Sequence, residues 1–338
     1  MILDNFKHEQ YAHCENGAIT NTLNYYCVGG QKISEPMVFG IGAGMYFLYF
    51  PLMKINNMPL LTYRNVPGFI LKNLCKSLNI KIRTRKFSTA VKARLALDEV
   101  LLQKQQPVML RAGVYNLSYF PKALRFNFNS HLIAVVGKEG DSYYISDSVM
   151  GELKQLSSDD LDLSRFARGA FAPKGAMFYV ESLPKSLDLE HGIRTGIKKT
   201  CANMVGAMAG PIKGVNGIKF LSRRMRTWEK TLKRSHAIAI LGHIMRTQEE
   251  IGTGGAGFRY IYADFLSESS KLLQNSSLDS LSKEMTLIGD AWREFACDAA
   301  KLFKERGEIV SFADLSDSLF KIALKEEEFF NELHKVKL

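Results

Sequence analysis

Residues 8–17 of the chain read HEQYAHCENG, and Cys14 in this stretch stands where a helix over residues 14–28 is expected to begin. The first turn of a helix carries unpaired backbone N–H groups and a partial positive charge. Both stabilise a thiolate, the nucleophilic form of cysteine, and the same N–H groups can hold an oxyanion. A lone cysteine is more often a small buried apolar residue. The interpretation of Cys14 as a nucleophile therefore depends on its partners.

Two short strands further along the chain supply candidate partners for this thiol. His131 opens the apolar run HLIAVVG, and Asp147 lies near the end of YYISDS at residues 143–148. If residues 137–141 form the turn, the strands pair antiparallel with His131 opposite Asp147, about 5 Å apart at Cβ. A one-residue slip would place the two side chains on opposite faces, and an exposed polar pair at the strand ends is the alternative. Cysteine, histidine and aspartate in this chain order form the papain-type arrangement of nucleophile, base and orienting group.

The remaining patterns predict a two-domain protein of the α+β class. The first half combines helical periodicity with short β-rich runs, which predicts helices first and a mostly antiparallel sheet after them. From about Ser186 onward we find amphipathic helical patterns and no convincing strand. Because a proline follows the last strand, we place the boundary near residues 182–190 and expect domains at 1–183 and 184–338. The predicted helices are 14–28, 66–79, 91–104, 236–251, 258–275, 279–304 and 311–336, and the predicted strands are 107–112, 131–137, 143–148 and 176–180.

Composition limits the classes of partner. The 338 residues include 45 Lys+Arg and 34 Asp+Glu, a net charge of +11 that points to an acidic partner. The basic stretches at 72–94 and 185–234 are also explained by solvated helix faces. They carry no nucleic-acid-binding motif, so we expect no nucleic acid. Five scattered cysteines without a CxxC pair argue against a disulfide framework or zinc site and, with no signal peptide visible, favour the cytoplasm.

Several segments together resemble the butirosin biosynthesis protein H family. They are HEQYAHCENGAITNTLNYYCVG at residues 8–29, GIGAGMYFLYF at 40–50, SHLIAVVG at 130–137 and YYISDSVMG at 143–151. In the second half, IGTGGAGFRYIYADFL at 251–266 and a helix carrying Trp292 are similar to the helical domain often fused to it. The resemblance implies a papain-like cysteine-enzyme domain followed by a mainly helical domain.

The resemblance also implies acyl transfer. An acyl group would leave a carrier-protein thioester, rest on Cys14 as the nucleophile, and pass to a small amine acceptor. His131 would match the base and Asp147 the orienting group. Carrier proteins are acidic, which suits the basic stretches, and no cofactor is implied. A papain-like peptidase or amidase using the same residues is one alternative, and a catalytically silent binding protein is another.

The side-chain donor for the oxyanion departs from the papain-like pattern, which commonly has a glutamine a few residues before the cysteine. Here His8 lies six residues before Cys14 and Gln10 lies four before it. We favour His8 on spacing and keep Gln10 as the second candidate. His13, adjacent to Cys14, is expected to be a structural or substrate-side group, because consecutive residues at a helix end point in different directions.

Two glycine-containing segments are further candidates for substrate binding. Pro36–Met53 is the longest stretch without a charged side chain, yet it is interrupted by glycines and prolines. A membrane span needs about 20 continuous apolar residues, so we expect a buried loop and helix and no stable span. Gly42 and Gly44 within it are positioned to form an apolar wall for an acyl chain, with plain core packing as the alternative.

Residues 252–257, GTGGAG, match the dinucleotide pattern G-x-G-x-x-G, but what precedes them reads as a helix and not as a strand. We therefore expect a glycine connection between helices and no cofactor. Gly254, Gly255 and Arg259 are candidates for shaping an acceptor or carrier surface. The remaining histidines form no ligand pattern and no HExxH occurs, so no metal is expected.

Overall fold

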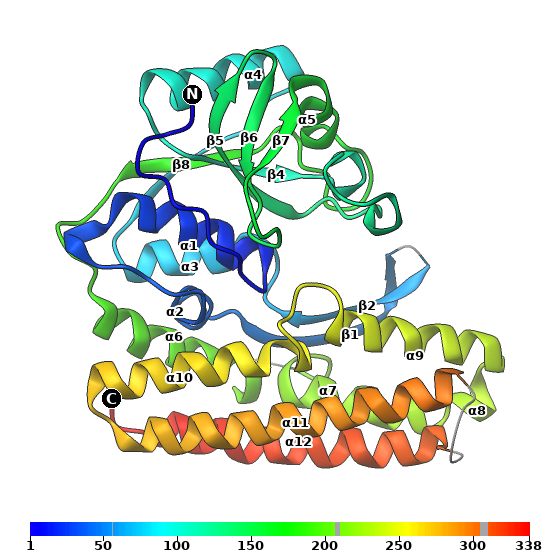
Figure 1. Ribbon diagram of the computed structural model, residues 1–338. Helices are drawn as coiled ribbons and strands as arrows, with labels where there is room; N and C mark the ends of the chain where they lie inside the picture. Colours follow the sequence, from blue (N-terminus) through cyan, green and yellow to red (C-terminus); the bar gives the residue numbers. More distant parts are fainter. Residues whose placement is uncertain (56, 207–209, 305–309) are drawn as a thin grey trace. The chain divides into compact units, whose positions relative to one another are not determined.

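The computed structural model describes residues 1–55, 57–206, 210–304 and 310–338 (Figure 1). The chain divides into two compact units: Met1–Val38 with Leu74–Asp188, and Phe39–Asn73 with Leu189–Leu338. This division differs from the single cut after residue 183 that the sequence predicts. Residues 39–73 belong with the helical unit because the hairpin they contain packs its apolar face on the helices of that unit.

The first unit is built on a six-stranded sheet in the order β3-β8-β4-β5-β6-β7 (Figure 1). Every neighbouring pair in it is antiparallel. The α+β class with an antiparallel sheet is thereby confirmed, including the four predicted strands. The strands are β3 (Lys81–Arg85), β4 (Val108–Ala112), β5 (His131–Glu139), β6 (Ser142–Ser146), β7 (Lys154–Ser157) and β8 (Met177–Ser182).

The β5–β6 hairpin pairs in a register that differs from the predicted one. Its turn is only Gly140 and Asp141, and the pairing closes with Glu139 opposite Ser142. Further from the turn, Val135 lies opposite Ile145, whereas the sequence predicted Tyr143 at that place. The tight turn alone would shift the register by an odd number of residues. A bulge at Val136 adds one more residue to β5, so the total shift is even and the predicted faces are preserved.

Helix α1 (Cys14–Tyr26) lies against β4 and β5. It is buried on all sides from Cys14 to Leu23, including the polar residues of that stretch. His13 caps the helix, because its side chain accepts a hydrogen bond from the Asn16 backbone N–H. The helix ends at Cys27, which adopts a left-handed conformation with φ of 44°.

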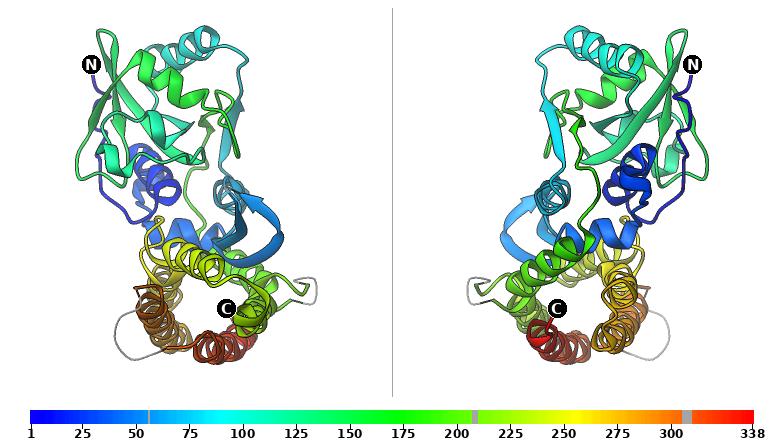
Figure 2. Two further views of the ribbon diagram at one scale, coloured as in Figure 1. Left: turned by 90° about the vertical axis from the view of Figure 1, so that its right-hand side faces the viewer. Right: turned by 90° about the vertical axis from the view of Figure 1, so that its left-hand side faces the viewer.

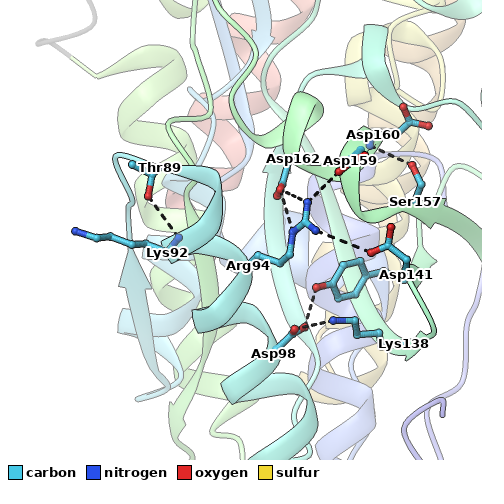
Figure 3. A network of polar contacts seen from close by, with 11 residues as sticks. Thr89, Lys92, Arg94, Asp98, Lys138, Asp141, Ser157, Asp159, Asp160 and Asp162 are labelled. Atoms are coloured by element: carbon cyan, nitrogen blue, oxygen red, sulfur yellow. Dashed lines mark hydrogen bonds and ion pairs between the residues drawn. The ribbon is translucent and has the colours of Figure 1, made fainter.

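The core of the first unit lies between the sheet and helix α4 (Ala90–Asp98), which continues as a π-helical turn over Glu99–Gln103. Figure 3 shows Arg94 of this helix bound to Asp159 and Asp162 of α5 (Ser158–Arg165). The residues of the apolar cluster are Leu3, Ala96, Leu97, Val100, Leu101, Val108, Leu110, Ala112, Leu117, Ile133, Val135, Tyr143, Ile145, Leu156, Leu161, Met177 and Tyr179.

In the second unit, β1 (Met45–Ile55) and β2 (Met58–Arg64) form a two-stranded antiparallel hairpin. The sequence predicted a loop and helix across residues 36–53, and only its first part is helical, as α2 (Glu35–Ile41). Burial alternates along the start of β1, with Met45, Phe47 and Tyr49 buried. This alternation is the period of a strand with one face against a core.

The helices of the second unit lie side by side in a bundle (Figure 2). The four helices predicted after residue 236 are confirmed, and the glycine segment before α10 is indeed a connection between helices. Among the described residues, no helix is long and apolar enough to cross a membrane. The helices are α6 (Leu189–Val205), α7 (Gly214–Arg226), α8 (Trp228–Thr231), α9 (Arg234–Glu249), α10 (Arg259–Leu273), α11 (Ser276–Lys304) and α12 (Phe312–Lys335), while α3 (Phe69–Ser77) spans the boundary of the two units.

Candidate active site

Cys14 is the first residue of α1, as the sequence predicts, and its side chain is almost fully buried. Among the described residues, no acceptor pairs with its backbone N–H. That N–H is one of the unpaired donors of a helix N-terminus. The nucleophile candidate therefore has a candidate oxyanion donor in its own backbone nitrogen, two bonds away from the thiol-bearing carbon.

His131 is the first residue of β5 and lies beside Cys14, close enough for the two side chains to interact electrostatically. Its Nε2 lies 2.7 Å from Asp147 Oδ2. Since the imidazole has only two nitrogens, Nδ1 is the atom left for the thiol. The edge of the ring packs against Phe120, with the ring centroids 5.8 Å apart. The structure thus brings together the three residues that the sequence singled out.

Asp147 follows β6 and is completely buried. Its Oδ2 accepts from His131 and from the Tyr119 hydroxyl at 2.8 Å, and its Oδ1 accepts from the Val149 backbone N–H at 3.3 Å. Burial by itself would raise the pKa of the carboxyl, but the charge and hydrogen bond of His131 and the other two donors outweigh it. The pKa of Asp147 is therefore lowered, and the carboxylate is the stable form.

The electrostatics of His131 follow from the same neighbours. Burial alone would lower the pKa of the imidazole. The charges of Asp147 and Cys14, and the hydrogen bonds to both, outweigh burial and raise the pKa of His131 well above its ordinary value. The geometry therefore favours an imidazolium held between a carboxylate and a sulfur. An imidazolium placed in this way stabilises a thiolate and can return a proton to a leaving group.

The turn that carries Asp147 is fixed to the start of α1. Gly17 of α1 packs directly on Ser148, so close that a Cβ at Gly17 would lie 2.4 Å from that of Ser148. The Ser148 hydroxyl donates to the Cys14 carbonyl at 3.4 Å, and its own carbonyl accepts from the Tyr11 N–H at 2.6 Å. A glycine at position 17 is required by this approach, and it holds the aspartate and the cysteine in one rigid arrangement.

His8 belongs to the same arrangement but has no donor to spare for an oxyanion. Its Nε2 lies 2.9 Å from the Met150 carbonyl, which can only accept, so Nε2 carries the proton. Its Nδ1 lies 2.8 Å from the Ser146 hydroxyl and accepts from it in the neutral ring. Gln10 is exposed, and its amide nitrogen lies 3.5 Å from the Val149 carbonyl. The backbone N–H of Cys14 is left as the better oxyanion donor.

Two residues near the site were not predicted. Glu35 is buried, and its carboxylate accepts from the backbone N–H groups of Ala12 at 3.0 Å and His13 at 2.8 Å, which fixes the chain just before Cys14. Burial raises the pKa of Glu35 despite these donors and the Asn16 side chain. The second unpredicted residue is Tyr119, whose hydroxyl donates to Asp147. Neither lies near a candidate residue in the sequence, and no motif distinguishes either one.

The four glycines that were candidates for substrate binding lie in the second unit, where they have structural roles. The Gly42 carbonyl accepts from Asn73 at 3.1 Å, and Gly44 packs on the Phe39 ring. Gly254 and Gly255 have positive φ angles of 67° and 89°, as a tight connection requires. His13, in the first unit, is buried and caps α1.

Arg259 is fully buried and is held by Glu326 of α12. Its Nε and Nη2 donate to the two carboxylate oxygens at 2.9 and 3.0 Å, and Nη1 donates to the Gly257 carbonyl at 2.7 Å. The guanidinium also faces the Trp292 ring, 4.8 Å from its centroid. A buried arginine satisfied in this way is part of the core and presents no surface to an acceptor or carrier. No cluster of potential metal ligands occurs in the described parts of the chain.

Comparison with known proteins finds two family models that match this chain. A family model described as "Butirosin biosynthesis protein H, N-terminal" matches residues 13–148, which contain Cys14, His131 and Asp147. A model described as "Domain of unknown function (DUF4872)" matches residues 159–333, more than half of the chain. The chain belongs to the butirosin biosynthesis protein H family. Within the first matched region, the cysteine that begins α1 lies beside the histidine that begins a strand of the antiparallel sheet.

Among solved structures, a putative C39-like peptidase from Bacillus anthracis is similar at 14% identity, over 54% of this chain and 98% of that chain, with a TM-score of 0.32. No curated protein has a matching sequence.

Proposed function

We propose that the protein is a cysteine-dependent acyltransferase that takes an acyl group from a carrier-protein thioester and gives it to a small amine. The observation that carries the proposal is the buried set of Cys14, His131 and Asp147 at the start of α1, in a chain of this family. A thiolate–imidazolium pair suits acyl exchange because both steps pass through a tetrahedral oxyanion beside the helix N-terminus.

In the first step, Cys14 Sγ attacks the thioester carbonyl, and the bond from that carbon to the carrier sulfur breaks. His131 gives its Nδ1 proton to the departing sulfur, so the carrier leaves as a thiol. In the second step, the amine nitrogen attacks the acyl-cysteine, His131 takes the proton of the amine, and Cys14 leaves as a thiolate. Asp147 holds the imidazole orientation and stabilises its charge in both steps.

An acidic carrier protein as donor is supported by charge. In the first unit, Lys76, Lys81, Arg83, Lys86 and Lys92 are exposed within a segment that contains no acidic residue. Attraction between such a surface and an acidic carrier speeds encounter and weakens as salt screens it. Acylation of Cys14 from a carrier-bound thioester is therefore expected to slow with rising salt, while acylation from the same acyl group on free pantetheine is not.

The test of the proposal is the lifetime of the acyl-Cys14 adduct. The enzyme is mixed with carrier proteins charged with acetyl, hexanoyl or aminoacyl groups, and the intact mass is followed with and without a panel of amines and amino acids. A transferase must hold its adduct against water at about 55 M, and positioning the acceptor can provide effective molarities of about 10⁵–10⁸ M. We expect the adduct to persist in buffer and to discharge quickly, with amide formation, when the right amine is present.

Two other outcomes would overturn the proposal. Rapid loss of the adduct in buffer, with the free acid as sole product, would identify a hydrolase using the same residues. No adduct with any thioester, together with iodoacetamide labelling of Cys14 no faster than that of the other four cysteines, would identify a silent binding protein. Cys14→Ala is the control that distinguishes acylation of this thiol from acylation elsewhere.

A further inference from the structure

The carboxylate of Asp147 has a partner that the reaction as written above does not use. The Tyr119 hydroxyl lies 2.8 Å from Asp147 Oδ2, the same oxygen that accepts from His131 Nε2 at 2.7 Å. Because a carboxylate only accepts, the tyrosine is the donor. One oxygen of Asp147 is thus shared between the catalytic imidazole and a phenol.

The surroundings of Tyr119 favour the protonated, hydrogen-bond-donating form of its phenol. Its ring is partly buried against the apolar cluster of the first unit and packs on Phe120, with ring centroids 5.2 Å apart. Burial first, then the negative charge and the hydrogen bond of Asp147, raise the pKa of Tyr119 well above its ordinary value. The protonated phenol is therefore favoured, and it donates the hydrogen bond to the carboxylate.

We propose that Tyr119 is a positioning residue of the active site: by sharing Asp147 Oδ2 with His131, its hydroxyl fixes the carboxylate and limits how strongly that carboxylate stabilises the imidazolium. This inference rests on the proposed function, since it assigns His131 the role of acid and base. The groups that face His131 are Cys14 from α1, Asp147 after β6 and the apolar Phe120 ring, so Tyr119 reaches the imidazole only through Asp147.

Removing the Tyr119 hydroxyl is expected to raise the pH at which His131 loses its proton. A hydrogen bond to a carboxylate withdraws part of its negative charge. Without the phenol, the full charge of Asp147 acts on His131, so the imidazolium is more stable and loses its proton at a higher pH. The carboxylate also loses one of its anchors, and His131 is then less well aligned with the thiol. A residue that only filled space would change neither the titration nor the alignment.

The experiment compares Tyr119→Phe with wild type by alkylation of Cys14 with iodoacetamide between about pH 5 and pH 10. The rate is followed by intact and peptide mass spectrometry, and the step caused by His131 deprotonation is located. We expect that step to move upward by about 0.5–1 pH unit. The rate of acylation by a thioester is expected to fall by about tenfold, with little change in KM.

Tyr143→Phe is the matched control. Its hydroxyl also donates to an aspartate in the first unit, Asp98 Oδ1 at 2.7 Å, in a network away from the site where Asp98 also binds Lys138 (Figure 3). The same atom is removed, from the same kind of hydrogen bond. We expect the alkylation profile of Tyr143→Phe to match that of wild type.

Two further measurements test whether the effect passes through Asp147. In an Asp147→Asn background, adding Tyr119→Phe is expected to cause no further shift, because the charge it modulates is gone. Replacing all tyrosines by 3-fluorotyrosine makes the phenol a stronger donor, which is expected to move the His131 step downward in wild type but not in Tyr119→Phe. The fluorinated protein keeps every hydroxyl, so if Tyr119→Phe does not fold, the fluorinated Asp147→Asn protein replaces it as the control and is expected to show no downward shift.

An unchanged profile in folded Tyr119→Phe, an equal shift in Tyr143→Phe, or no downward shift on fluorination would each overturn the proposal. Alkylation needs no acyl donor. If wild type accepts no acyl group from any thioester, the proposed function fails, while the alkylation profiles still decide the role of Tyr119.

Discussion

Two buried carboxylates, one in each unit, are held by the same kinds of partner and yet serve different ends. In the first unit, Asp147 Oδ2 accepts from His131 and from the Tyr119 hydroxyl. In the second, Glu326 Oε1 accepts from Arg259 Nε at 2.9 Å and from Trp292 Nε1 at 2.6 Å. Each is a carboxylate shared by a cationic group and an aromatic donor, and both carboxylates are fully buried.

The difference lies in what the cationic partner has left to do. All three guanidinium nitrogens of Arg259 are bonded, and an arginine does not lose its proton in a protein. His131 uses one nitrogen on Asp147 and keeps the other for Cys14, and it titrates. On the proposed function, the first cluster can transfer a proton because a titratable imidazole lies beside Cys14, whereas the second cluster holds the core because each guanidinium nitrogen is bonded.

The comparison is tested most strongly by His131→Ala. Removing the base is expected to slow acyl-Cys14 formation by about 10³–10⁴-fold, while Asp147→Asn, which leaves the base in place, costs less. Acylation is followed by intact mass spectrometry, and circular dichroism checks the fold of each variant. Acylation of His131→Ala at the wild-type rate would show that the base is another residue.

Glu326→Leu tests the structural cluster. It leaves the Arg259 guanidinium buried without its counter-charge, so the free energy of unfolding is expected to fall by about 3–5 kcal/mol. The matched control is Glu327→Gln, one residue further along α12, where the carboxylate is partly exposed and pairs with Lys219 at 2.7 Å. That pair is expected to contribute no more than about 1 kcal/mol. Urea unfolding of the three proteins measures both, and a loss below about 1 kcal/mol in Glu326→Leu would contradict the structural role.

A third buried charge sharpens the comparison because it follows neither pattern. Arg165, at the end of α5, is fully buried, and none of its guanidinium nitrogens has an acceptor among the described residues. Burial lowers the pKa of Arg165 to about 10, although neighbouring acids oppose the effect. Replacing an unsatisfied buried charge by an apolar side chain of similar length removes its desolvation cost. Arg165→Met is expected to raise the free energy of unfolding by about 1–3 kcal/mol.

The control for that substitution is Arg94→Met in the same unit. Arg94 is one-third exposed and binds Asp162 at 2.6 Å and Asp159 at 3.1 Å (Figure 3). Its removal is expected to cost up to about 1 kcal/mol, the opposite sign. If Arg165→Met is less stable than wild type, a bound water or anion must accept from the guanidinium. Arg165 would then be a satisfied buried charge, like Arg259.

Much of the fold was predictable from local sequence. Periodicity placed the helix that begins at Cys14, the antiparallel strands of the first unit and the four helices after residue 236, because these patterns reflect one buried face. Chain order and residue type also indicated Cys14, His131 and Asp147. The strand in GMYFLYF was missed, since a short apolar run fits a buried helix as well as a strand until its neighbours are known.

The site itself was decided by tertiary structure. Whether His131 and Asp147 share a face depends on the parity of the hairpin register, and the tight Gly140–Asp141 turn alone would have separated them. The bulge at Val136 restores the parity, and the Leu3 N–H bonds the carbonyl of that extra residue at 2.8 Å. That contact joins segments more than a hundred residues apart, so no local pattern contains it.

Contacts between distant parts of the chain also explain the other differences between the predicted and the observed roles of residues. The sequence predicted Arg259 as a surface residue, but it is buried because it pairs with Glu326, far along the chain. Tyr119 and Glu35 contact the site through hydrogen bonds that only the folded chain makes. The sequence by itself determined which residue types were available and which helices and strands would form, because those depend on neighbours along the chain. Only the tertiary structure determined which carboxylates accept from two donors, which polar groups have hydrogen-bond partners and which side chains stay reactive. The reason is that hydrogen bonds and burial depend on neighbours in space.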